Sequence, residues 1–106
     1  MSTERDYADL IVALLQPEPV RVHPMFGEYC LYHNEKPVAF LCDNRVLLKP
    51  TNQPIDAVQG LETGEAYPGS KLYFIAPEDR LDTLWFRETI VEMSGLLPKP
   101  KPRKKR

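Results

Sequence analysis

Cysteine and histidine are the residues of this chain with the most versatile chemistry, and there are two of each. Cys30, Cys42, His23 and His33 match neither a C-x-x-C nor an H-x-x-x-H spacing, so we predict no metal site. A nucleophilic pair of Cys30 with His23 or His33 would also need an orienting group and oxyanion donors. No local signature supplies them. A small cysteine enzyme is therefore the third of three functional hypotheses, and we predict no catalytic residue.

The other candidate groups have structural explanations. Both cysteines fall inside predicted strands, where a free thiol packs as a small hydrophobe, and we expect them to be reduced and metal-free. Glu78 and Asp79 follow Pro77, and acidic residues at that place favour the positive end of a helix. The glycines form neither a G-x-G-x-x-G motif nor a phosphate-binding loop, so we expect no cofactor and no enzyme.

Aromatic residues are spread over the predicted strands and invite a base-stacking interpretation. Strands favour aromatic residues for packing, however, and their alternation sends many of them to the core. Stacking on nucleic acid also needs a positive groove, and the predicted sheet carries few cations. Core packing is therefore the favoured role of these seven side chains: Tyr29, Tyr32, Tyr67, Tyr73, Phe26, Phe40 and Phe74.

The C-terminus carries the strongest charge feature. Residues 1–98 hold eight basic and all 15 acidic residues, for a net charge of −7. The segment after Pro98 has no apolar residue, and we expect residues 98–106 to be a disordered tail. Such a tail can contact phosphates without sequence specificity, can aid solubility, or can contact the acidic body. Its six cations are the candidate nucleic-acid-binding residues: Lys99, Lys101, Arg103, Lys104, Lys105 and Arg106.

Two helices are predicted to enclose a β-rich region. Ser2 or Thr3 is the expected cap of a first helix. Its buried stripe has helical spacing, and Pro17 and Pro19 end it. A second helix is predicted from Leu81 to Met93 with Gly95 as its terminator. The stripe of the first helix comprises Tyr7, Leu10, Ile11, Leu14 and Leu15; the broad face of the second comprises Leu81, Leu84, Trp85, Phe86, Ile90, Val91 and Met93.

The region between the helices has the pattern of an antiparallel meander. Short apolar runs alternate with polar turns, and a bend is expected at Phe26-Gly27. Residues 50–69 are polar, with one or two helical turns. The predicted strands are Val20–Val22, Tyr29–Tyr32, Val38–Cys42, Arg45–Leu48 and Lys71–Ala76. We therefore predict an α+β domain over residues 1–97, with an antiparallel sheet of four to five strands and both helices packed on one face.

Length and composition fit a single globular domain, with 42% hydrophobic and 27% charged residues. No apolar run approaches the ~20 residues of a membrane helix, so we expect no membrane association. The N-terminus lacks the basic and apolar regions of a signal peptide, and two cysteines are too few for a disulfide scaffold. The expected compartment is the cytoplasm.

The stretch from Met25 to Tyr32, Met-Phe-Gly-Glu-Tyr-Cys-Leu-Tyr, resembles the opening of N-terminal domains of the TfoX/Sxy family. The following strands through Lys49 and the Tyr67-Pro68-Gly69 triplet extend the resemblance. Glu28 and Cys30 stand where the family often has glycine. The family-motif residues are Met25, Phe26, Gly27, Tyr29 and Tyr32.

The resemblance implies a stand-alone regulatory domain. Longer members look like regulators of natural competence that act with the transcription machinery. Our leading hypothesis is therefore a non-enzymatic regulatory or protein-interaction domain whose partner is another protein, with a component of the transcription apparatus as the candidate. The alternative is a nucleic-acid-associated protein tethered through its basic tail.

Overall fold

A computed structural model describes residues 3–51 and 53–97 of the chain. The predicted α+β class is confirmed, with six strands rather than four to five. The sheet is antiparallel with the order β1-β2-β3-β4-β6-β5. The elements are α1 (Arg5–Leu15), β1 (Val20–Met25), β2 (Glu28–His33), β3 (Lys36–Cys42), β4 (Arg45–Leu48), the 3₁₀ turn η1 (Asp56–Val58), β5 (Thr63–Glu65), β6 (Leu72–Ile75), the 3₁₀ turn η2 (Glu78–Arg80) and α2 (Leu84–Leu96).

Strands β1 to β4 form the predicted meander. Cys30 of β2 pairs with Phe40 of β3, and Phe40 pairs with Leu47 of β4. Each of the three connections is a two-residue turn with positive φ at both positions, as type I′ hairpin turns require. These turns are Phe26-Gly27, Asn34-Glu35 and Asp43-Asn44.

The sixth strand is the short β5, which the sequence pattern did not predict. Its three residues Thr63, Gly64 and Glu65 include no large apolar side chain, so no alternation marks it. Strand β5 forms because its backbone pairs with β6, for example Gly64 with Tyr73. A Cβ at Gly64 would lie 3.3 Å from the Ile75 side chain, which is a tight contact, so glycine suits this position.

Helix α1 matches its predicted span, but its start and buried stripe differ. The predicted cap at Thr3 is wrong: Glu4 is the N-cap residue and makes no side-chain capping bond. The Thr3 hydroxyl instead lies 2.9 Å from the carbonyl oxygen of Leu41 in β3. Leu10 was expected inside and is half exposed, whereas Ala8 is fully buried.

The C-terminal helix begins later and ends later than predicted. The residues after Pro77 form η2 instead of the first α-helical turn, and α2 begins at Leu84 with Thr83 as N-cap. Gly95 does not terminate the helix, which continues to Leu96. The broad apolar face is also narrower than expected, because Leu84 and Val91 are exposed.

Trp85 is only partly buried, contrary to the expectation of a large core residue. Its indole nitrogen donates a hydrogen bond to the Ala57 carbonyl oxygen at 3.1 Å, and the Arg80 guanidinium lies 5.5 Å from its ring. Phe86, one residue later, is fully buried and occupies the core position that Trp85 was expected to hold.

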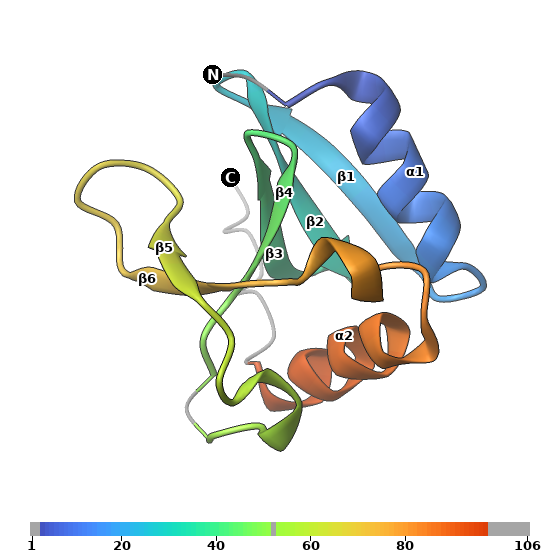
Figure 1. Ribbon diagram of the computed structural model, residues 1–106. Coiled ribbons are helices and arrows are strands. Elements are labelled where there is room, and N and C mark those ends of the chain that lie inside the picture. The colour runs from blue at the N-terminus through green and yellow to red at the C-terminus, as the bar shows by residue number, and fades with distance from the viewer. Residues whose placement is uncertain (1–2, 52, 98–106) are drawn as a thin grey trace, which may run out of the picture.

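The main core lies between the sheet and both helices, so the predicted packing on one face is confirmed. Ile11 of α1 and Phe86 of α2 share this cluster with Leu31 and Leu41 of the sheet. Figure 1 shows the helices against the sheet and the β5–β6 hairpin reaching away from them. The opposite face, which we call the open face, carries a smaller cluster of Cys42, Leu47 and Tyr73 with Phe40 packed against it.

Candidate functional site

The β1–β2 turn presents a fully exposed aromatic side chain. Phe26 has φ of 53° and a relative exposure of 100%. Left-handed backbone is costly for a bulky residue and is normally given to Gly, Asn or Asp. Gly27 meets this preference at φ 81°, and Phe26 does not. The sequence places a strained phenylalanine where it contributes no packing.

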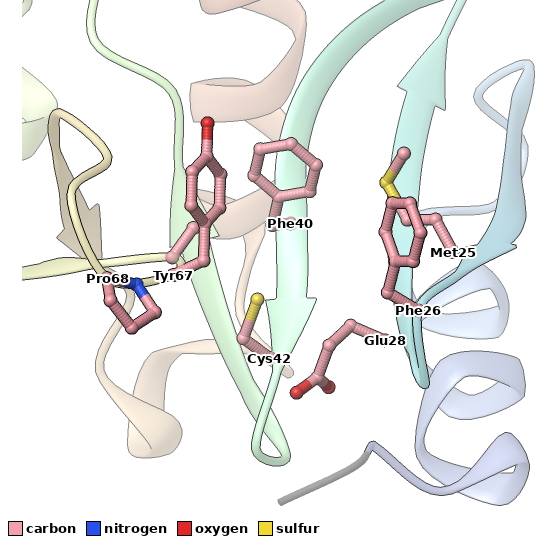
Figure 2. Close-up of a pocket in the computed structure, with 8 residues that line it drawn as sticks. Met25, Phe26, Glu28, Phe40, Cys42, Tyr67 and Pro68 are labelled. Carbon is pink, nitrogen blue, oxygen red and sulfur yellow. The ribbon is translucent and has the colours of Figure 1, made fainter.

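Phe26 stands on one wall of an apolar groove of about 660 Å³ on the open face. Figure 2 shows Met25 and Phe26 on one side and Tyr67 and Pro68 on the other, with Phe40 and Cys42 between them. Tyr67, in the loop between β5 and β6, is 60% exposed. Two aromatic side chains from segments about forty residues apart in sequence therefore flank one hollow.

The floor of the groove is formed by side chains of the sheet. Phe40 packs edge-on against Tyr73, with ring centroids 5.4 Å apart and an interplanar angle of 65°. Such edge-to-face pairs add stability beyond the area that they bury. Phe40 is held between the neighbouring residues Cys30 and Leu47 of the adjacent strands. The groove is therefore a feature of the sheet and not of a loop alone.

Glu28 is the charged residue that lines the groove. Its Oε1 accepts a hydrogen bond from the Thr3 hydroxyl at 2.5 Å and from the Asp43 backbone N–H at 3.2 Å. Thr3 also donates its backbone N–H to the Gly27 carbonyl oxygen, and its hydroxyl oxygen accepts from the Asn44 N–H. The buried Thr3 thus ties both turns at this end of the sheet to the Glu28 carboxylate.

Both cysteines are free and buried, as predicted for core residues. Burial raises the pKa of the Cys42 thiol to about 11, and the nearby Glu28 carboxylate raises it further. Burial also raises the pKa of Cys30. The reactive form of cysteine is the thiolate, so both side chains stay as neutral thiols at neutral pH.

The histidines lie in different environments. His23 is exposed on β1 opposite Cys30, so the register brings one hypothetical Cys–His pair together. The protonated Cys30 thiol is nevertheless a poor nucleophile. His33 is buried, and its Nε2 lies 2.8 Å from Glu18 Oε1. Across residues 3–51 and 53–97, no three His, Cys, Asp or Glu side chains gather into a group that could hold a metal ion.

The family-motif residues do not share one role. Met25 and Phe26 line the groove, and Gly27 completes the turn. Tyr29 packs against the main core on the helix side. Tyr32 lies on the open face, 4.3 Å from the Arg21 guanidinium. The candidate nucleic-acid-binding residues Lys99, Lys101, Arg103, Lys104, Lys105 and Arg106 all fall outside the described residues.

The sequence interpretation missed Glu28 and Cys42 as groove residues and did not connect Phe26 with Tyr67. A usable signal was the Phe-Gly pair between two strands, because both positions of a two-residue hairpin turn favour residues that tolerate positive φ. Tyr67 lies near Phe26 because β6 pairs with β4. The segment between these two strands has no clear periodicity, so the sequence does not predict this pairing.

Comparison with known proteins finds a relative that matches nearly the whole chain. No family model matches the chain. The chain is 44% identical over 105 residues to the "Uncharacterized 12.7 kDa protein in trpE 5'region" of Spirochaeta aurantia, an alignment that covers 98% of this chain and 91% of that protein. In the part of the chain that the structure describes, no helix has the length and apolar character to cross a membrane.

Proposed function

The chain belongs to one family with this Spirochaeta aurantia protein, and we propose that it is a non-enzymatic protein-interaction domain whose groove binds a short peptide segment of a partner. The observation that carries the proposal is Phe26. A phenylalanine at φ 53° costs on the order of 1–2 kcal/mol, and full exposure means that no packing offsets this cost. Strained residues concentrate at binding sites.

The groove also defines the chemistry of its ligand. Its walls and floor are aromatic and apolar, from Phe26, Phe40 and Tyr67, and suit a proline or another apolar side chain. The Glu28 carboxylate and the net charge of −7 over residues 1–98 favour a neighbouring cation. A proline-rich, basic segment in extended conformation combines both features.

The biological setting of this proposal comes from sequence resemblance. The TfoX-like stretch from Met25 to Lys49 includes one wall of the groove. We place the domain in the cytoplasm as a regulatory adaptor, with a component of the transcription apparatus as its partner. The groove supplies the contact surface for that role.

A peptide selection on the full-length protein tests the proposal. Random peptides displayed on phage are selected against the immobilised chain, and the enriched sequences are measured by fluorescence polarisation. We expect an apolar or proline residue beside Lys or Arg, and at least about tenfold weaker binding, or 1.4 kcal/mol, to Phe26→Asn.

Leu84→Asn is the matched control, because Leu84 is an exposed apolar residue that does not line the groove. Its binding should equal that of the wild type. Equal losses in both variants, or selected peptides without a cation, would overturn the proposal.

The second candidate function is tethering to nucleic acid, favoured by the six cations that follow Pro98. Phosphate contacts by all six would give a slope of log affinity against log salt of at most about −5 on duplex DNA. A salt titration with labelled duplex measures the slope. A flat profile, or a marked dependence on DNA sequence, would refute tethering through the tail.

A further inference from the structure

The C-terminal segment has the chemistry that the groove favours. Residues 98–103 alternate proline with basic residues, and Lys104, Lys105 and Arg106 follow. Alternating prolines favour the extended polyproline II conformation, which docks in aromatic-lined grooves at low entropic cost. The chain therefore carries its own candidate ligand for the site proposed above.

Charge complementarity supports this pairing. The segment after Pro98 has six cations and no acidic residue, whereas residues 1–98 have a net charge of −7. Glu28 lines the groove, and Thr3 and Asp43 bond only its Oε1 among the described residues. A cation near Oε2 would complete the coordination of this carboxylate.

The end of α2 lies within reach of the groove. Lys36 Nζ donates to the Ser94 carbonyl oxygen at 2.7 Å, so the last turn of α2 lies beside the first residue of β3. The groove lies at the other end of the same strand, at Cys42. Seven residues of β3 span about 20 Å.

Nine extended residues after Leu97 are long enough to reach the near end of the groove. At 3.1 Å per residue they span about 28 Å. The path to Phe40 needs about 13 Å along β3 and ~10 Å to pass around the β2–β3 turn onto the open face, or about 23 Å in all. Phe40 lies two residues before Cys42, so the basic end of the segment reaches the groove.

We propose that the basic end of residues 98–106 docks in the groove of its own chain and competes with the partner peptide, while the prolines before it keep the segment extended. This inference rests on the proposed function, because it assigns an occupant to the same site. A tethered segment acts at an effective concentration in the millimolar range. With an intrinsic dissociation constant about tenfold lower, the segment fills the groove in about nine molecules of ten and weakens an external ligand about tenfold.

The test uses full-length protein and one named probe, a fluorescein-labelled peptide with the sequence Pro-Lys-Pro-Lys-Pro-Arg-Lys-Lys-Arg. In the tail variant, all six basic residues after Pro98 become Gln. We expect the probe to bind this variant about tenfold more tightly than the wild type. Adding Phe26→Asn should abolish the gain, whereas adding Leu84→Asn should preserve it.

Amide NMR spectra provide the second readout. The Gly27 and Tyr67 resonances should differ between wild type and tail variant, and this difference should not depend on protein concentration. A concentration-dependent difference would overturn docking within one chain in favour of a second copy.

The two proposals fail differently. Equal probe affinity for wild type and tail variant, while phage-selected peptides still require Phe26, would refute docking of the tail and leave the proposed function standing. If neither the probe nor any selected peptide requires Phe26, the proposed function itself is refuted.

Discussion

The turns Phe26-Gly27 and Asp43-Asn44 lie at the same end of the sheet and share one backbone geometry. In the second turn both residues tolerate positive φ, and the Asn44 side chain accepts a hydrogen bond from the Glu4 N–H. In the first turn, Phe26 is strained and touches solvent on all sides. Turn chemistry therefore accounts for the residues Asp43-Asn44, whereas Phe26 needs another explanation, for which we propose peptide binding.

The largest expected effect is the loss of stability on truncating a core residue, and it sets the scale for the smaller effects at the turns. Phe86→Ala should lower the free energy of unfolding by about 3–5 kcal/mol, because Phe86 is fully buried between α2 and the sheet. Trp85→Ala should cost less, about 1–2 kcal/mol, since Trp85 is only partly buried. Chemical denaturation of both variants measures the difference. A larger loss for Trp85→Ala would reverse our assignment of the core position.

Removing the Thr3 hydroxyl, which links the two turns, should cause the next largest loss of stability. Thr3→Val removes the hydroxyl that lies between Glu28, Leu41 and Asn44, and leaves buried polar groups without a partner. We expect a loss of about 2–3 kcal/mol in the free energy of unfolding. Thr63→Val, at an exposed residue of β5, is the matched control and should change stability little. Equal effects of the two changes would contradict the role of Thr3.

Alkaline pH should destabilise the groove end of the sheet through Cys42. The pKa of this thiol is about 11 in the fold, against an ordinary value of 9.0, so the folded state keeps its proton over this interval. The stabilisation is full below pH 9 and is lost as pH rises from 9 to 11, by on the order of 2 kcal/mol. Urea unfolding across this range measures the slope, which should become shallower in Cys42→Ala. An unchanged slope in that variant would assign the titration to other groups.

Regular periodicity made most of the fold predictable, and the site much less so. The helical spacing from Tyr7 to Leu15 predicts α1, and the alternation around Tyr29 and Val38 predicts β2 and β3. The structure contains all three elements. The end of α2 and strand β5 escaped prediction, because tertiary contacts override weak local preferences there. The groove combines residues of β1, the β1–β2 turn, β2, β3 and the β5–β6 loop, and no local pattern predicts that they lie close together.

Asn44→Phe tests whether phenylalanine at positive φ also costs stability in the second turn. This change gives the second turn the strain of the first and removes the Asn44 side-chain bond to the Glu4 N–H. We expect a loss of about 1–2 kcal/mol, measured by chemical denaturation, with peptide binding unchanged. A gain in stability would show that positive φ is not costly for phenylalanine in this setting.

The most direct test of whether Phe26 serves binding at a cost in stability is Phe26→Asn, measured for stability and for peptide binding in the same samples. Asparagine tolerates φ of 53° better than phenylalanine, so the free energy of unfolding should rise by about 0.5–1 kcal/mol. Peptide affinity should fall at least about tenfold, because one wall of the groove is lost. Opposite changes in stability and binding are the predicted result; a loss of stability with unchanged binding would show that Phe26 serves the fold and not a partner.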